Sequence, residues 1–250
     1  MRYQAAPQHR SSTLHCVRAL AIVHQADAGP GVFADAVVEA GWELETWSPP
    51  THPQPADVNH FDAVLTFGGA MHPDQDDEYS WLATERKLLA GLIERGVPTL
   101  GVCLGSELVA QAARGNTARM PDPEIGWYEV AVTDEGERDP LLASLSSAFD
   151  AFQWHSYECL PADGAVELAR SDAGLAAFRI GERAWGIQFH AEVTAADLEH
   201  WIRDYRTDPD AVRIGIDPDA LLAETRTKIA ASNDLGAKIC ASFLEVATAA

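Results

Sequence analysis

The chain has 250 residues, of which 47% are hydrophobic and 22% charged, as in ordinary soluble globular proteins. Its net charge of −20 disfavours binding to nucleic acids or to anionic membrane surfaces, because both need basic patches. The apolar runs are short and interrupted, so no transmembrane helix is expected. The four cysteines lack CxxC spacing and the first residues lack a secretory leader, which predicts reduced thiols and a cytoplasmic protein.

The first half of the chain alternates between strand and helix patterns. Apolar and amphipathic runs follow one another as strand 17–25, helix 31–41, strand 42–48, strand 61–69, helix 78–96, strand 97–102 and helix 104–115. Residues 48–60 carry four prolines and are expected to form a loop. This alternation is typical of an α/β protein with a parallel sheet covered by helices on both faces.

The second half is richer in strands. Strand patterns occur at 126–133, 151–156, 165–171, 175–181 and 183–190. Thr194 and Asp197 have the spacing of a capping box, which predicts the start of a helix over 195–205. In the tail, Asp217 and Pro218 predict a helix start, and two helices are expected, over about 218–231 and 234–247.

These patterns predict one domain with two terminal extensions. Residues 1–17 are polar and are expected to be mobile, residues 18–205 to form the domain, and residues 206–250 to form a helical appendage. The apolar positions of the appendage have the spacing of helices with one buried face. We expect that face to pack on the domain; a subunit interface, and hence a homo-oligomer, is the alternative.

The segment GVCLG, residues 101–105, places a cysteine where a strand passes directly into a helix. Such a junction forces a sharp turn with small neighbours, which is the logic of a nucleophile elbow. The turn would expose Cys103 at the carboxyl edge of the sheet, the helix N-terminus would favour its thiolate, and the Leu104 N–H could stabilise an oxyanion. A buried core thiol is the alternative, and it is our expectation for Cys16, Cys159 and Cys240.

A cysteine nucleophile needs a base and a group that orients the base. His190 ends a predicted strand and Glu192 lies two residues on, so both face the same side of an extended chain. The carboxylate can then hold the imidazole in one tautomer. The glycine pair Gly68-Gly69 ends another strand and could supply a second oxyanion donor, although an ordinary glycine turn would look the same.

Several motifs occur in one order along the chain: GG at 68–69, GVCLG at 101–105, EIGW at 124–127, FQWHS at 152–156 and GIQFHAE at 186–192. Through them the chain resembles class I glutamine amidotransferases over about residues 18–205, and most of all the free-standing group similar to the glutaminase domain of GMP synthase. The resemblance implies a flavodoxin-like α/β fold with a mostly parallel sheet.

The same resemblance implies that a cysteine attacks the side-chain amide of glutamine, ammonia leaves, and water hydrolyses a glutamyl thioester. It assigns Cys103 as nucleophile, His190 as base and Glu192 as its orienter, with the amides of Gly69 and Leu104 as the oxyanion hole. His155 and Ser156 are candidate substrate-binding residues, and a buried structural role is the alternative for His155.

One departure from the family bears on the substrate: Glu107 stands where glutamine is usual. It lies one helical turn after Cys103 on the same face, so it should look toward the bound substrate. An ionised carboxylate there would favour an amine, repel a carboxylate and raise the thiol pKa of Cys103. We therefore predict weak use of free glutamine, unless Glu107 turns aside to a cation or serves the helix dipole.

Three functions remain open from the sequence. The first is a glutaminase that supplies ammonia to a synthase; since the chain has no GxxxxGK[ST] motif, that synthase would be another chain. The second is a γ-glutamyl peptide or amide hydrolase, and the third a non-catalytic regulatory subunit. A zinc deaminase is disfavoured because no PCxxC follows the HAE segment. No metal or other cofactor is expected.

Overall fold

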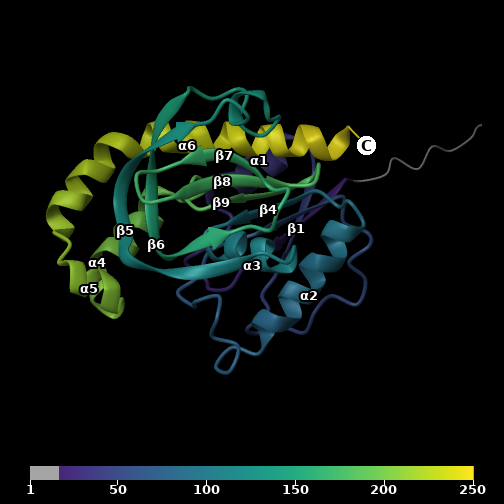
Figure 1. The fold of residues 1–250 in the computed structure, drawn as a ribbon, viewed down its shortest axis with the longest axis horizontal. Helices are drawn as coiled ribbons and strands as arrows, with labels where there is room; N and C mark the ends of the chain where they lie inside the picture. The colour runs from purple at the N-terminus through teal and green to yellow at the C-terminus, as the bar shows by residue number, and fades with distance from the viewer. Residues whose placement is uncertain (1–16, 250) are drawn as a thin grey trace, which may run out of the picture.

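One sheet of nine strands runs through the computed structural model, which describes residues 17–249 (Figure 1). Its strand order is β2-β1-β3-β4-β9-β8-β7-β5-β6. The strands are β1 Arg18–Ile22, β2 Glu43–Trp47, β3 Ala63–Thr66, β4 Thr99–Val102, β5 Asn116–Val132, β6 Ala148–Leu160, β7 Val166–Arg170, β8 Leu175–Ile180 and β9 Ala184–Ile187. The mobility expected of residues 1–17 concerns, apart from Val17, a segment outside the described residues.

The sheet has a parallel half and an antiparallel half. The first five strands of the order, β2 to β9, pair in parallel. The other four extend the β9 edge by antiparallel pairing, ending in the long β5–β6 hairpin. The α/β class expected from the sequence is confirmed, and the antiparallel half makes the sheet mixed. Cys103 and His190 follow two adjacent parallel strands, β4 and β9, so the topology brings them to one edge.

Helices cover both faces of the sheet, as Figure 1 shows. The first face carries α1 (Gly31–Glu39) and α6 (Pro218–Thr248), and the second carries α2 (Trp81–Glu94) and α3 (Leu104–Ala112). Successive side chains of a strand point to opposite faces. In β1, Ala19 and Ala21 therefore join the core under α1 and α6, while Leu20 and Ile22 join the core under α2 and α3.

Two shorter helices, α4 (Ala195–Arg203) and α5 (Pro209–Ile214), lie near the β5–β6 hairpin in Figure 1. Short 3₁₀ turns precede β6 at Gly136–Arg138 and α5 at Tyr205–Thr207. The predicted capping box opens α4, with the Thr194 side chain accepting from the Asp197 N–H. Among residues 17–249, no helix has both the length and the apolar character needed to cross a membrane.

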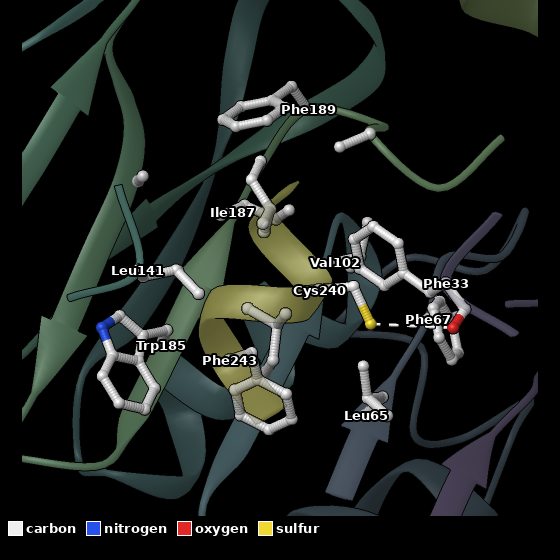
Figure 2. Packing of buried hydrophobic residues seen from close by; sticks show 14 of the residues in the cluster. Phe33, Leu65, Phe67, Val102, Leu141, Trp185, Ile187, Phe189, Cys240 and Phe243 are labelled. Atoms are coloured by element: carbon white, nitrogen blue, oxygen red, sulfur yellow. Dashed lines mark hydrogen bonds between the residues drawn. The ribbon is translucent and has the colours of Figure 1, made fainter. Parts of the chain in front are cut away.

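The last helix is part of the main core, as Figure 2 shows. The Cys240 thiol of α6 donates to the Phe33 carbonyl of α1 at 3.6 Å. Phe243, one turn further on, packs edge-on against Trp185 of β9, with ring centroids 6.2 Å apart. Burying aromatic side chains of this size contributes a large share of core stability. The sheet's first face is therefore covered largely by residues from the end of the chain.

The prediction of two tail helices is wrong, because α6 is one helix over Pro218–Thr248. The expected break fell on the polar run Ser232-Asn233-Asp234. In the structure Ser232 is buried and the Asn233 side chain donates to the Val193 carbonyl at 2.7 Å. Tertiary contact thus satisfies a polar residue that looks like a helix breaker in sequence. The start of the helix is as predicted, with Asp217 as cap and Pro218 in the first turn.

Replacing Gly236 tests how closely α6 packs against Ala191. A methyl group on Gly236 would lie 1.9 Å from the Ala191 carbonyl oxygen. Helix propensity alone would make Gly236→Ala stabilising by about 1 kcal/mol. We predict the opposite sign, a free energy of unfolding lower by about 1–3 kcal/mol, because α6 must move away from residue 191. Urea denaturation measures it. Gly29→Ala, whose methyl meets nothing within 4 Å, is the control. A Gly236→Ala protein more stable than wild type would contradict this packing.

Candidate active site

Cys103 is the single residue between β4 and α3, and its backbone is strained. Its φ is 52° and its ψ −116°, a region that a side chain enters at a cost of order 1–3 kcal/mol. Its N–H is held by the Ile187 carbonyl of β9 at 2.9 Å. A methyl group on Gly101 would lie 2.4 Å from the Gly105 oxygen, and one on Gly105 would lie 2.1 Å from the Thr66 oxygen. Both flanking glycines are needed for the close approach of α3 to the strands.

His190 and Glu192 form a buried pair beside the thiol. The His190 Nδ1 lies 2.9 Å from the Glu192 Oε1. The Cys103 thiol donates to the Trp154 carbonyl at 3.7 Å, and it is close enough to His190 for the imidazole to oppose the rise in the thiol pKa that burial causes. The Trp201 ring covers the imidazole edge-on at a centroid distance of 5.0 Å. The Glu192 backbone is held as well, since its carbonyl accepts from the Val32 N–H of α1 at 2.8 Å. The structure thus brings the three sequence-predicted residues together in one constellation.

Burial and neighbouring charges have opposing effects on the pKa values of Cys103 and His190. Burial raises the pKa of the Cys103 thiol, and the nearby His190 opposes this rise. Burial would lower the pKa of His190, but the charges of Glu192 and of a Cys103 thiolate outweigh it and raise that pKa to about 10. The sequence predicts that the α3 N-terminus favours the thiolate. In the structure burial works against the thiolate, and His190 is the group that favours it.

Two backbone amides lie beside the thiol. Leu104 is the first residue of α3, so its N–H has no acceptor within the helix. Gly69 is close by, since a methyl group on it would lie 3.4 Å from a Leu104 methyl carbon. Within residues 17–249, neither amide donates to a protein acceptor. Gly69, Cys103 and Leu104 line the same cavity.

That cavity has a volume of about 220 Å³, and one of its walls comes from the segment 200–209. Its walls include Trp154 of β6, Trp201 of α4, and Tyr205 and Asp208 beyond α4. Asp208 caps α5 and accepts from the Trp154 indole N–H at 2.7 Å. Sequence reasoning missed this wall. Its only local signal is Asp208 before Pro209, which marks a helix start and says nothing of a site.

His155 and Ser156 line the cavity, but protein groups engage their polar atoms. The His155 Nδ1 lies 2.8 Å from the Tyr157 carbonyl, and its Nε2 lies 3.0 Å from the Glu124 carboxylate. The Ser156 hydroxyl donates to Asp210 of α5 at 2.6 Å. These bonds hold β6 and α5 in place at the edge of the cavity.

Glu107 lines the cavity, and the pKa of its carboxyl group is raised. Gln188 donates to its carboxyl group at 3.1 Å. Burial, reinforced by the charge of Asp74, raises the pKa of Glu107 to about 8. The alternative in which it turns aside to a cation is wrong, since its hydrogen-bond partner is a neutral amide. With this raised pKa, Glu107 is mostly a neutral acid at neutral pH, and in that form it resembles the glutamine usual there.

The described part of the chain holds no group of three or more His, Cys, Asp or Glu side chains arranged to bind a metal ion. The described cysteines, Cys103, Cys159 and Cys240, are all free. The groups at the cavity include a thiol, an imidazole–carboxylate pair and two backbone N–H donors. This set suits attack on a carbonyl carbon followed by stabilisation of the resulting oxyanion.

Known proteins share this fold and parts of this sequence. The glutamine amidotransferase-like protein YfeJ of Salmonella typhimurium is 27% identical over 188 residues, covering 73% of this chain and 78% of that protein. GMP synthase (glutamine-hydrolysing) of Aeropyrum pernix is 33% identical over 129 residues, covering 49% of this chain and only 25% of the synthase. The crystal structure of a glutamine amidotransferase from Thermotoga maritima is 26% identical with a TM-score of 0.81, covering 94% of this chain and 99% of that one.

A family model described as glutamine amidotransferase class-I matches residues 31–204. The matched segment runs from α1 to the end of α4 and contains Gly69, Cys103 and the His190–Glu192 pair. The similar solved structures also confirm the flavodoxin-like fold predicted from the sequence. Since the match covers more than half of the 250 residues, the chain belongs to the class-I glutamine amidotransferase family.

Proposed function

We propose that this protein hydrolyses the side-chain amide of glutamine through a covalent thioester on Cys103 and releases ammonia. The observation that carries the proposal is the convergence, at one cavity, of a strained thiol, a buried imidazole–carboxylate pair and two unbonded amides. Family membership supports the reaction class, since members are glutamine-hydrolysing amidotransferases. Measuring ammonia release from glutamine by the purified chain tests the proposal directly.

In the first step His190 takes the thiol proton and the Cys103 sulfur attacks the amide carbon. The carbonyl π electrons move onto oxygen, and the N–H groups of Gly69 and Leu104 stabilise this oxyanion. When the tetrahedral intermediate collapses, the C–N bond breaks and His190 gives its proton to the leaving nitrogen, so ammonia departs. Glu192 holds the His190 Nδ1–H at 2.9 Å and stabilises the imidazolium between these transfers.

In the second step water replaces ammonia. His190 takes a proton from water, the hydroxide attacks the thioester carbon, and the same two amides stabilise the second oxyanion. Collapse breaks the C–S bond, releases the acid and returns the proton to the sulfur. The charge of Glu192, which raises the pKa of His190, favours the imidazolium needed to protonate the leaving group in the first step.

We further propose that the ammonia passes to a synthase carried by another chain. The match to GMP synthase of Aeropyrum pernix covers only a quarter of the length of that synthase, so most of the synthase has no counterpart in this sequence.

The charge of the cavity favours a second candidate, the hydrolysis of a γ-glutamyl compound that carries an amine. Besides Glu107, which is mostly neutral at neutral pH, the described residues lining the cavity include three carboxyl groups and neither lysine nor arginine; these carboxyl groups are Asp27, Asp204 and Asp208. Such a lining attracts a cation more readily than a second carboxylate. Comparing the hydrolysis of free glutamine with that of a γ-glutamyl amide bearing an amine separates the two candidates.

The nucleophile can be identified by labelling. A glutamine analogue with an electrophile in place of the amide should label Cys103 alone, as mass spectrometry of digested protein would show. Cys159 and Cys240 are buried in the core, and burial raises the pKa of Cys240 to about 12, so neither should react. Cys103→Ala should abolish ammonia release and leave the thermal unfolding transition in place. Labelling of Cys16 or Cys159 with Cys103 unmodified would overturn the assignment.

Replacing the base His190 should lower activity more than replacing Glu192, which orients it. His190→Ala should lower kcat/KM by about 10³-fold or more, because the members of a triad act as a unit. Glu192→Gln keeps the shape of the side chain and removes only its charge, so its loss should be smaller. Steady-state kinetics measures both, and far-UV circular dichroism checks that each variant is folded. Near-normal turnover by His190→Ala would contradict the proposal and make His155 the next base to test.

The raised pKa of Glu107 predicts that kcat/KM for glutamine depends on pH. Its pKa of about 8 means that it is neutral below pH 8 and ionised above. Ionisation places a like charge near the α-carboxylate of glutamine, so kcat/KM of wild type relative to Glu107→Gln should fall as pH rises through about 8, by roughly tenfold. An amine-bearing γ-glutamyl amide is the control and should show no such fall. If the ratio of wild-type to Glu107→Gln kcat/KM stayed constant from pH 6.5 to 9.5, either the pKa of Glu107 or its closeness to the substrate carboxylate would be contradicted.

A further inference from the structure

Two consecutive side chains that follow β1, those of His24 and Gln25, hold the glycine turn beside the thiol. The His24 Nδ1 lies 3.1 Å from the Gly68 carbonyl oxygen. The Gln25 side-chain oxygen accepts from the Ala70 N–H at 2.8 Å. These two bonds fix the peptide units on either side of Gly69. Glycines would otherwise let those units rotate with little resistance.

The first of these bonds decides where the Gly69 N–H points. The Gly68 carbonyl and the Gly69 N–H belong to one peptide unit, and a trans peptide directs them to opposite sides. No described peptide bond is cis. With the carbonyl directed at His24, the N–H is directed away from it. Gly69 lines the cavity, and its N–H donates to no acceptor within residues 17–249.

His24 is itself anchored on its other side. Its Nε2 lies 2.8 Å from one oxygen of Glu85, and the other Glu85 oxygen accepts from the Thr66 hydroxyl at 2.7 Å. Its ring stacks on Trp81 at a centroid distance of 5.0 Å. Both ring nitrogens face acceptors, so the ring carries two N–H groups when both bonds form. Burial lowers the pKa of His24, but Glu85 outweighs it and the pKa is raised, which agrees with a doubly protonated ring.

Fold stability alone is a poor explanation of this arrangement. The side chains of His24 and Glu85 are fully buried, and a buried ion pair often stabilises a fold no better than apolar residues of the same size. What this pair does uniquely is present an N–H to one carbonyl of a glycine turn in the active site. A flipped 68–69 peptide would direct an oxygen, in place of an N–H, at the developing oxyanion.

We propose that His24, anchored by Glu85, is a positioning residue that keeps the Gly69 N–H turned toward the substrate oxygen. The inference rests on the proposed function, because it explains the orientation of one of the two oxyanion donors. His24 touches no reacting atom in this scheme and acts through the Gly68–Gly69 peptide. Gln25 assists it by holding the next peptide unit through the Ala70 N–H.

A matched pair of variants separates the two nitrogens of His24. The amide nitrogen of His24→Asn falls near the position of Nδ1 and can still donate to Gly68, whereas the longer side chain of His24→Gln reaches toward Glu85. Both variants lose the ion pair, so their thermal stabilities should fall alike. We expect His24→Gln to lower kcat about 10²-fold with KM little changed, as loss of one oxyanion donor does. His24→Asn should lose less than about tenfold.

Two further measurements distinguish positioning from damage to the site. Alkylation of Cys103 by iodoacetamide needs no oxyanion donor, so wild type and both variants should react at similar rates. A glutamine analogue with an aldehyde in place of the amide forms a tetrahedral adduct, and its affinity should fall in His24→Gln by about the same factor as kcat.

Equal activity losses in the two His24 variants, with wild type active, would overturn the inference and leave the proposed function standing. A wild-type protein that neither hydrolyses a γ-glutamyl amide nor binds the aldehyde would overturn both. If His24→Gln does not fold, Gln25→Leu and Gln25→Glu form a second pair at a partly exposed position. The leucine variant loses the acceptor for Ala70 and should lower kcat, while the glutamate variant keeps the acceptor and should lower kcat less, although it loses the donor to Asp27. Equal kcat values would overturn the inference.

Discussion

The site depends on one backbone constraint, the passage of a parallel strand into a helix through the single residue Cys103. A φ of 52° at a residue with a side chain is tolerated only where the surroundings hold it. Here the Ile187 carbonyl binds its N–H, and the glycines on either side let α3 lie directly against β3 and β4. The same junction sets the thiol at the sheet edge, frees the first amide of α3, and places Glu107 one turn along. The residue with the strained backbone, Cys103, is therefore also the proposed nucleophile.

Around this junction the protein places three buried histidines, each facing a buried glutamate. The pairs are His24–Glu85 at 2.8 Å, His155–Glu124 at 3.0 Å and His190–Glu192 at 2.9 Å. Their second ring nitrogens have different partners, and this difference separates their roles. That of His24 faces a turn carbonyl and that of His155 a strand carbonyl, so both hold backbone. Burial raises the pKa of the Cys103 thiol, and of the three histidines His190 is the one that opposes this rise. The same chemical pair thus serves structure twice and the proposed reaction once.

Much of the fold and the central residues of the site could be predicted from the sequence, because both depend on local patterns. The strand–helix junction at Cys103 and the i, i+2 spacing of His190 and Glu192 are visible within a few residues. The remaining features depend on distant contacts. Asp208 meets Trp154 only in the folded chain, and His24 meets Gly68 across 44 residues. The unbroken α6 depends on the Val193 carbonyl, which satisfies Asn233. The ionisation of Glu107 depends on burial, which no spacing reveals.

The seating of α6 bears on when the site can form during synthesis. This helix is translated after every strand of the sheet, yet Asn233 binds the Val193 carbonyl and Gly236 lies against Ala191. Phe243, still later in the chain, packs on Trp185 of β9. While the ribosome still encloses this segment, the loop that carries His190 and Glu192 lacks its outer support. A nascent chain can therefore build the Cys103 elbow from earlier residues, but the loop paired with it is completed only after α6 has emerged.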